Sequence, residues 1–208
     1  KELIQHIVAN RKWMDIGTGS GGILDELSPL ASKTYAVEPQ KIARDSLKQL
    51  GYDVYQSIKN VTEKDIDVVT LFHVFEHFTN PLEDLNLIFQ KMNSQGKIVI
   101  EVPHAKDFLI SFLEHESFKI FTFWSEHLIL HTRQSLTIFL EKAGFKDVIV
   151  TGCQRYPLAN HLHWLSKNQP GGHQKWNFLR TFELDSAYSQ MLGQLDKNDT
   201  IIATATKA

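Results

Sequence analysis

A short apolar stretch that runs into a glycine-rich loop restricts the fold of this chain more than any other feature. Residues 12–16 have the pattern of a buried strand, and glycines follow at positions 17, 19, 21 and 22, where a helix is expected to open. Glycine adopts positive φ and has no side chain, so such a turn brings backbone amides close to a ligand. The spacing of Gly17, Gly19 and Gly22 also satisfies the G-x-G-x-x-G dinucleotide fingerprint, so the loop alone leaves the ligand open.

Asp15, at the carboxyl end of this strand, distinguishes two classes of ligand. A carboxylate there would repel a pyrophosphate, but it suits a ligand that carries an ammonium group beside a sulfonium. S-adenosylmethionine is such a ligand, so the sequence favours it over a nicotinamide dinucleotide. The alternative role for Asp15 is that of an N-cap for the following helix.

A second acid, Glu38, ends the next apolar stretch, residues 34–37. Its distance from the loop is close to the roughly 20 residues at which an acid receives the ribose hydroxyls in βαβ nucleotide sites. Because both candidate cofactors contain a ribose, Glu38 indicates a nucleoside without choosing between them. The alternative is a solvated strand end.

Composition narrows the class of function. The 208 residues suit one α/β domain covering 1–208, and 22 Lys and Arg against 24 Asp and Glu give a net charge of −2. Such a surface offers no broad electrostatic grip on nucleic acid or membrane, so we expect a small-molecule substrate and leave the oligomeric state open. No apolar run approaches the ~20 residues of a membrane span. The lone cysteine, Cys153, excludes an internal disulfide and fits a reducing cytoplasm.

Apolar stretches alternate with helical patterns along the chain, which predicts a doubly wound α/β fold. One helix is expected to have Asn80 as its N-cap and Pro81 at its first position, and another to run from about Thr132 to a stop at Gly144. The predicted strands are 12–16, 34–37, 53–56, 67–72, 97–102, 146–150 and 200–206.

Two segments, about 105–131 and 154–180, interrupt the alternation and are rich in aromatic residues and histidines. Ligands of open α/β sheets bind beyond the carboxyl ends of the strands, and both segments leave from or near that edge. We therefore expect them to form the walls of a substrate pocket. The alternative is that their aromatic side chains only pack together as a small extra core.

The sequence resembles the class I S-adenosylmethionine-dependent methyltransferases. Asp-Ile-Gly-Thr-Gly-Ser-Gly (15–21) is similar to the family's first motif and Val-Glu-Pro (37–39) to its second. Residues 67–77 resemble the fourth-strand motif of the branch that includes the ubiquinone-biosynthesis O-methyltransferases, and residues 126–128 and 143–145 resemble later blocks of that branch. The resemblance implies a Rossmann-like, seven-stranded, mostly parallel sheet with a reversed last strand and helices on both faces.

The resemblance also implies a cofactor site for S-adenosyl-L-methionine. Family members usually place an acid or amide after the third strand to receive the adenine amino group, but this chain has no acid there, and Gln56 or Ser57 could accept that hydrogen bond while Ile58 covers the ring. Residues 156–173 resemble insertions in methyltransferases of bacterial surface-polysaccharide pathways. The cofactor-binding residues we predict are Asp15, Gly17, Thr18, Gly19, Gly21, Glu38, Pro39, Ser57, Phe72 and His73.

Transfer of a methyl group to a hydroxyl needs a base, and histidine has a pKa suited to that task. We rank His104 and His127 as the catalytic candidates ahead of His73, which is expected to pack against the cofactor. In the ubiquinone branch, acids and a histidine of the fourth-strand motif can bind a divalent ion, and Glu76 and His77 match two of those positions. The third position, an acid in that branch, is His73 here, and a histidine suits transition metals more than magnesium. The alternative is that Glu76 caps a helix and His77 packs against its neighbours, and on that interpretation we predict no metal site.

The leading hypothesis is an enzyme that methylates a hydroxyl of a small polar or sugar-like metabolite. A nicotinamide-dependent oxidoreductase is the second, since the glycine spacing permits it. A third is a cofactor-binding partner subunit that has lost its chemistry.

Overall fold

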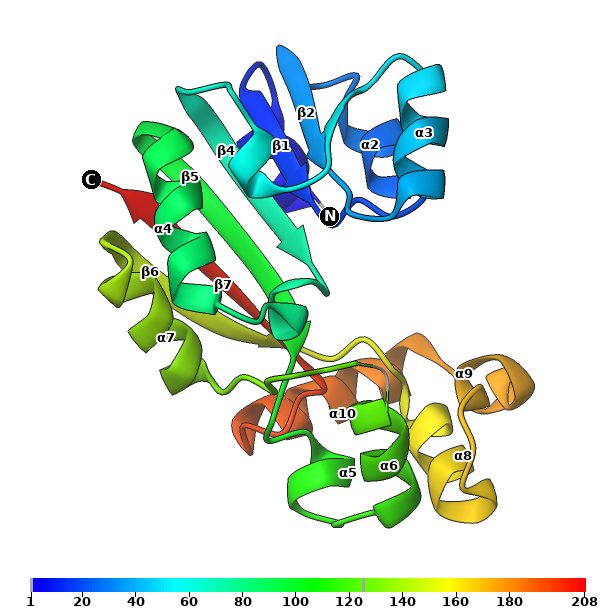
Figure 1. Cartoon of the computed structure of the whole chain (residues 1–208). Coiled ribbons are helices and arrows are strands. Elements are labelled where there is room, and N and C mark those ends of the chain that lie inside the picture. Colours follow the sequence, from blue (N-terminus) through cyan, green and yellow to red (C-terminus); the bar gives the residue numbers. More distant parts are fainter. Residues whose placement is uncertain (1, 125) are drawn as a thin grey trace.

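A seven-stranded sheet is the frame of the molecule (Figure 1). The computed structural model describes residues 2–124 and 126–208. The strand order is β3-β2-β1-β4-β5-β7-β6, and β7 runs antiparallel to both of its neighbours. The predicted doubly wound sheet with a reversed last strand is thereby confirmed. The strands are β1 (Lys12–Ile16), β2 (Lys33–Val37), β3 (Asp53–Tyr55), β4 (Ile66–Phe72), β5 (Met92–Pro103), β6 (Phe145–Cys153) and β7 (Thr200–Lys207).

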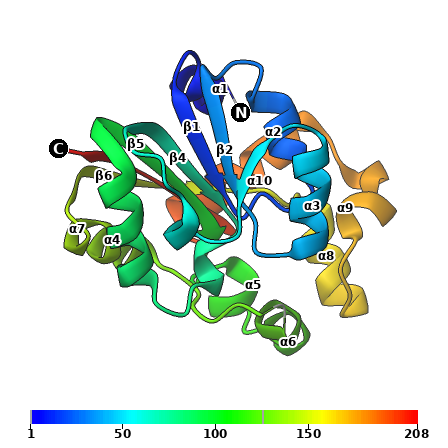
Figure 2. The same ribbon diagram turned by 45° about the horizontal axis from the view of Figure 1, so that its top comes forward.

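Helices cover both faces of the sheet, so the central strands are apolar on both sides. Trp13 and Val68 point into a core shared with α1 (Glu2–Val8), α2 (Gly22–Leu27) and α3 (Lys41–Gln49). Met14 and Val69, the next residues along, point into the opposite core against α4 (Pro81–Lys91) and α7 (Arg133–Lys142). Figure 2 shows these two sets of helices on opposite sides of the strands.

The predicted helix boundaries are confirmed for α4 and α7. Thr132 is the N-cap of α7, where its side chain accepts from the Ser135 N–H and the Ser135 side chain accepts from the Thr132 N–H. Gly144 follows α7 with φ +97°, a left-handed conformation that glycine adopts without penalty. Asn80 is the N-cap of α4 with Pro81 after it, although its side chain makes no capping hydrogen bond with the described residues.

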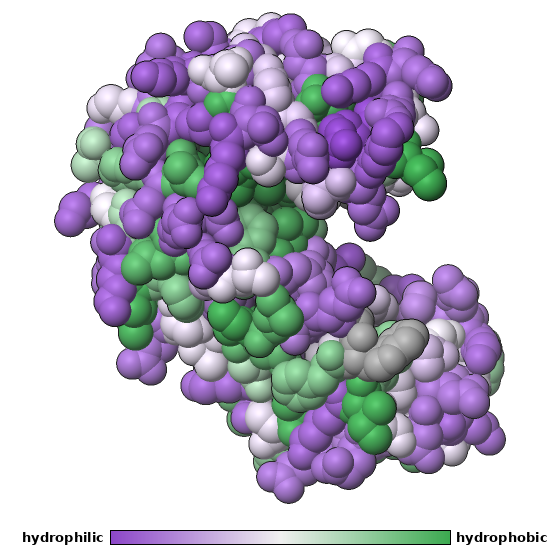
Figure 3. Space-filling model, viewed as in Figure 1, coloured by the Kyte–Doolittle hydropathy of each residue, from purple (hydrophilic) through white to green (hydrophobic). Residues whose placement is uncertain are grey.

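The two interrupting segments form a group of helices beyond the carboxyl edge of the sheet (Figure 1). They contain α5 (Phe108–Ser111), α6 (Glu116–Trp124), α8 (Leu158–Lys167), α9 (Gly172–Lys175) and the short helix η3 (Asn177–Leu179), and α10 (Phe182–Gln194) follows. Trp164 joins the two segments, because its ring contacts those of Phe118 and Phe121 at centroid distances of 5.0 and 5.3 Å. Figure 3 shows the surface deeply notched between the part with α2 and α3 and the part with α8 and α9.

Two strands extend beyond the predicted bounds by more than one residue. β5 begins at Met92, because α4 runs into it without a loop and Met92 pairs with Ile66 ahead of an irregularity in register. β6 continues to Cys153, since Gly152 and Cys153 still pair with the start of β7. No helix in the described part of the chain is long and apolar enough to cross a bilayer.

Candidate functional site

The glycine loop after β1 has a backbone that only glycine adopts without strain. Gly17 and Gly21 have φ values of +76° and +93°. A Cβ on Gly17 would lie 2.2 Å from a methyl carbon of Val74, and one on Gly21 would lie 2.5 Å from a methyl carbon of Leu47. A Cβ on Gly19 would meet no described atom within 4 Å, so the loop is open to a ligand at that point.

Glu38 is bound to this loop. Its carboxylate accepts hydrogen bonds from the backbone N–H groups of Gly19 and Gln40, both at 2.7 Å, and its side chain is almost fully buried. Glu38 is therefore not a solvated strand end. Each carboxylate oxygen has more than one acceptor site, so these bonds leave capacity for ligand hydroxyls.

A cavity of about 530 Å³, which we call the glycine-loop cavity, lies beside these residues. Of the predicted cofactor residues, Gly17, Gly19, Glu38, Pro39 and Ser57 line it, together with Gln56 and Ile58. Asp15, Thr18, Gly21, Phe72 and His73 do not. The cavity is also lined by residues that were not predicted to belong to the cofactor site, among them Gln40, Lys59, Val74, Phe78, Asp84 and Glu126.

Asp15 lies under the loop rather than at its surface. Its two carboxylate oxygens accept hydrogen bonds from the hydroxyls of Thr70 and Thr18, at 2.5 and 2.8 Å. Burial raises the pKa of Asp15 to about 7, although both hydrogen bonds act in the opposite direction. The N-cap of α2 is Gly21, so Asp15 is not that cap.

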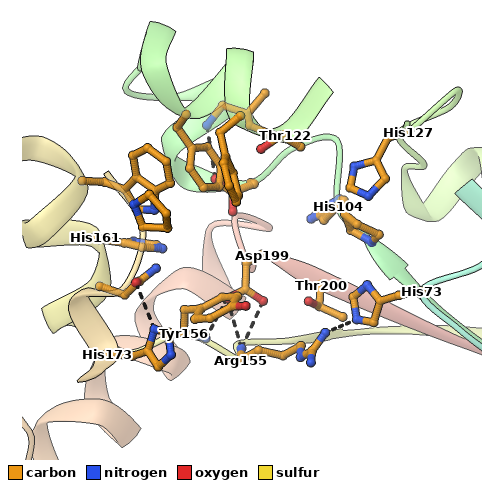
Figure 4. A pocket seen from close by; sticks show the side chains of 18 of the residues that line it. His73, His104, Thr122, His127, Arg155, Tyr156, His161, His173, Asp199 and Thr200 are labelled. Carbon is orange, nitrogen blue, oxygen red and sulfur yellow. Dashed lines mark hydrogen bonds between the residues drawn. The ribbon is translucent and has the colours of Figure 1, made fainter. Parts of the chain in front are cut away.

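A second cavity, of about 230 Å³, lies among the helices beyond the carboxyl edge. We call it the histidine cavity, because His73, His104, His127, His161 and His173 line it (Figure 4). The first three lie on one side and the last two on the other. The aromatic residues that line the cavity come from both interrupting segments: Phe118, Phe121, Tyr156 and Trp164. The two segments therefore pack together and also enclose a space.

His104 has a fixed tautomer in this cavity. Its Nδ1 lies 3.1 Å from the carbonyl oxygen of Asn198, which can only accept, so Nδ1 carries the proton. Nε2 has no hydrogen-bond partner among the described residues. Burial lowers the pKa of His104, which favours the neutral ring with its Nε2 lone pair available.

His127 and His73 lie around the buried carboxylate of Glu76. Their nearest ring nitrogens are 3.8 and 3.6 Å from Glu76 Oε1. Burial lowers the pKa of His127. Burial also opposes the charged form of His73, but attraction to Glu101 and Glu76 outweighs it and raises the pKa of His73.

The expectation that Glu76 caps a helix is wrong. Neither of its carboxylate oxygens has a hydrogen-bond donor within the described residues, and its side chain is fully buried. Its backbone carbonyl instead receives the N–H groups of Leu128 and Ile129. The backbone of Glu76 thus connects β4 to the segment after α6.

Two acids of the histidine cavity were not predicted. Burial, with the charge of Asp199 as a second cause, raises the pKa of Asp107 to about 7, and Asp107 Oδ1 accepts from the N–H groups of Leu109 and Ile110. Asp199 accepts from the N–H groups of Arg155 and Tyr156, and its carbonyl receives the His104 N–H. The predicted reversal of β7 is the feature from which Asp199 could have been found. An antiparallel last strand begins at the carboxyl edge of the sheet, and Asp199 directly precedes that strand.

Comparison with known proteins identifies the family. A family model described as "Methyltransferase domain" matches residues 1–150. A SAM-dependent methyltransferase structure from Archaeoglobus fulgidus is similar with a TM-score of 0.66 at 20% identity, covering 99% of this chain and 90% of that one. A possible histamine N-methyltransferase from Thermotoga maritima gives 0.65 at 17% identity, covering 100% and 86%.

Phosphoethanolamine N-methyltransferase 2 from Haemonchus contortus, in complex with S-adenosyl-L-methionine, gives a TM-score of 0.62 at 15% identity, covering 99% of this chain and 51% of that one. No curated protein matches. None of these comparisons supports a nicotinamide-dependent oxidoreductase. The chain belongs to the methyltransferase domain family and is an S-adenosylmethionine-dependent methyltransferase.

Proposed function

We propose that this enzyme transfers the methyl group to a hydroxyl of a small polar or sugar-like metabolite, bound in the histidine cavity. The observation that carries the proposal is the cavity itself, which combines aromatic faces with the unpaired Nε2 of His104. Aromatic faces suit the C–H surface of a ring, and histidine and asparagine suit its hydroxyls. Bacterial surface-glycan biosynthesis is the setting that the resemblance of residues 156–173 favours.

In this proposal the cofactor occupies the glycine-loop cavity. Glu38 accepts the ribose hydroxyls, the amides of the loop approach the ligand at Gly19, and Gln56, Ser57 and Ile58 surround the adenine. Asp15 balances the ammonium group from beneath the loop. Gly17 and Pro39 line the same cavity. Thr18, Gly21, Phe72 and His73, which do not line it, stay in the proposal as cofactor contacts predicted from the sequence.

The two cavities share a boundary that suits methyl transfer. His73 and His127 line the histidine cavity, whereas their neighbours Val74 and Glu126 line the glycine-loop cavity. A methyl group near this boundary would face an acceptor in the histidine cavity, as in-line displacement requires. Enclosure by α6 and α8 would exclude water from the reaction.

His104 and His127 are the two candidates for the base that removes the hydroxyl proton. His104 is favoured, since its Nδ1–H is bound to a carbonyl and its Nε2 lone pair is unpaired. His127 has Glu76 beside it, which would stabilise the imidazolium formed when it takes a proton. In both residues burial lowers the pKa, so the neutral, basic form predominates.

Two measurements test the proposal. Calorimetric titration should show S-adenosylmethionine binding to the folded protein. Formation of S-adenosylhomocysteine should then depend on a hydroxyl acceptor, measured with a panel of sugars, nucleotide-linked sugars, phenols and amines. Turnover with amines alone would contradict the hydroxyl assignment, and tight cofactor binding with no turnover on any acceptor would favour the non-catalytic alternative.

We also propose that residues 1–208 form one catalytic domain and that the enzyme acts in the cytoplasm on a small molecule, without nucleic acid or membrane. The sheet, which carries a core on each of its faces, supports the first point. The lone Cys153 supports the second.

A further inference from the structure

A buried carboxylate surrounded by histidine nitrogens lies at the boundary between the two cavities. Glu76 Oε1 is 3.6 Å from Nδ1 of His73, 4.0 Å from Nε2 of His77 and 3.8 Å from Nε2 of His127. The Glu76 side chain is 0% exposed, and neither oxygen has a hydrogen-bond donor among the residues described. Burying a carboxylate without hydrogen-bond donors costs free energy, and a cation bound to its oxygens would offset that cost.

The rings of His77 and His127 turn a nitrogen lone pair, and not an N–H group, toward the carboxylate oxygens of Glu76. His77 Nδ1 lies 3.0 Å from the carbonyl oxygen of Glu126, so Nδ1 carries the proton and Nε2 presents its lone pair toward Glu76. The His127 ring likewise hydrogen-bonds the backbone of Thr122, while its Nε2 faces Glu76. At 3.8 and 4.0 Å these nitrogens are too far from the carboxylate to share a proton with it in a hydrogen bond.

We propose that Glu76, His77 and His127 bind one divalent transition-metal ion of the zinc type. One ligand atom from each of these three residues lies within 4.8 Å of the others. In a tetrahedral zinc site with bonds of ~2.0–2.2 Å, neighbouring ligand atoms are about 3.4 Å apart, slightly less than the separations here. Ring nitrogens held by backbone carbonyls are the usual second contacts of metal-binding histidines.

The donor set determines which ion fits. Two imidazoles and one carboxylate suit zinc, cobalt or nickel, whereas magnesium prefers an all-oxygen set. The third ligand, His127, comes from the segment after α6 rather than from the fourth-strand motif. His73 is held by Glu101 at 3.0 Å and lies outside the group of three.

The use of the ion rests on the proposed function. His127 lines the histidine cavity and His77 the glycine-loop cavity, so an ion between them would lie next to both acceptor and cofactor. A bound ion would supply Lewis-acid activation of the acceptor hydroxyl. His127 would then be a ligand, and His104 would be the only base of the two candidates.

Cobalt binding tests the site without any turnover. Chelator-treated protein without a histidine tag is titrated with Co²⁺, and binding is followed by the visible d–d absorption of the bound ion. In a second experiment the protein is incubated with an equimolar mixture of Zn²⁺, Co²⁺ and Mg²⁺, and its metal content is measured after desalting. We expect one bound ion per chain, zinc or cobalt over magnesium. Glu76→Gln, His77→Ala and His127→Ala should each weaken Co²⁺ binding by at least the ~10–100-fold that even outer-sphere changes cause. His6→Ala, an exposed histidine on α1, is the matched control and should bind as wild type.

The absence of a d–d band in folded wild-type protein would overturn the site, as would unchanged Co²⁺ affinity in either His77→Ala or His127→Ala. These two exposed or half-buried positions keep the test decisive if Glu76→Gln does not fold. Calorimetry with S-adenosylmethionine on the metal-free protein separates the two proposals. Cofactor binding and acceptor turnover without Co²⁺ binding reject the metal site alone, whereas Co²⁺ binding without transfer to any hydroxyl rejects the proposed acceptor alone.

Discussion

Burial gives Asp15 a behaviour that its sequence position does not reveal. The pKa of its carboxyl group is raised from 3.8 to about 7 because desolvation outweighs the hydrogen bonds from Thr70 and Thr18. Between these two pH values the folded chain holds a proton that the unfolded chain has lost. The stability contribution of Asp15 therefore falls as pH rises from about 4 to 7, and the deficit persists above 7.

Replacing Asp15 should flatten this pH dependence. A shift from 3.8 to about 7 corresponds to at most about 4 kcal/mol. Urea unfolding of the cofactor-free protein at pH 5 and pH 7.5 should show wild type losing stability over this interval and Asp15→Asn losing less. Asp107, also raised to about 7, remains in both proteins and accounts for part of the slope. Equal slopes in the two proteins would mean that Asp15 ionises normally.

The ammonium group of the cofactor should reverse this shift. At pH 6 Asp15 is protonated in the free enzyme, and a bound cation would ionise it, so titration in buffers of different ionisation enthalpy should show release of nearly one proton. Asp15→Ala should abolish the release and cost about 2–4 kcal/mol of cofactor affinity, the scale for removing one partner of a buried charged pair. An unchanged affinity would reject the predicted ammonium contact.

His104 should carry the proton transfer. His104→Ala should lower turnover by roughly 10²–10⁴-fold while leaving the calorimetric affinity for S-adenosylmethionine unchanged, because the residue lines only the histidine cavity. The lowered pKa of His104 places the acid limb of the wild-type pH–rate profile below the ordinary range for histidine. His6→Ala should match wild type. Full turnover in His104→Ala would transfer the role to His127, to an activated ion or to water.

At the scale of elements, local signals specified some boundaries and not others. Thr132 and Gly144 fixed α7 because a capping box and a left-handed glycine act within a few residues. The start of β5 at Met92 and the end of β6 at Cys153 depend on pairing with Ile66 and Thr200, which no local pattern encodes. Sequence reasoning therefore worked where the determining contact is near in the chain.

The same distinction separates the site residues. The glycine loop and Glu38 could be predicted because one βαβ unit brings them together. Asp107 and Asp199 could not, because their place in the histidine cavity depends on helices and a reversed strand far along the chain. Glu76 was assigned the wrong role for the same reason, since its neighbour His127 arrives from the segment after α6.

The capping box of α7 should contribute measurably to stability. Thr132→Ala removes the acceptor of the Ser135 N–H and should lower the free energy of unfolding by about 1 kcal/mol. In a chain of this size that corresponds to a fall of about 2–4 °C in Tm, measured by circular dichroism. Thr79→Ala, at an exposed position before α4, is the control and should change Tm little. A loss no larger than in the control would mean that another donor or water satisfies the helix end.

At the scale of the whole molecule, the sheet and the added helices hold different parts of the reaction. The glycine-loop cavity is formed chiefly by segments that follow β1, β2, β3 and β4, and the histidine cavity chiefly by the helices beyond the carboxyl edge and the start of β7. Segments 73–77 and 126–127 are the places where both parts meet. Cofactor binding and acceptor binding should therefore respond to different substitutions.

Trp164→Ala tests this division. Trp164 is buried among Phe118, Phe121 and His115, so its removal should destabilise the protein by about 3–5 kcal/mol and enlarge the histidine cavity. At a temperature where the variant is folded, KM for the acceptor should rise while the affinity for S-adenosylmethionine stays at its wild-type value. Phe178→Ala, an aromatic side chain that is 79% exposed, is the control for both measurements. If Trp164→Ala lowered the affinity for S-adenosylmethionine by the same factor as it raised KM for the acceptor, the division would be wrong. The edge of the sheet would then be insufficient to bind the cofactor, and the added helices would form part of its site.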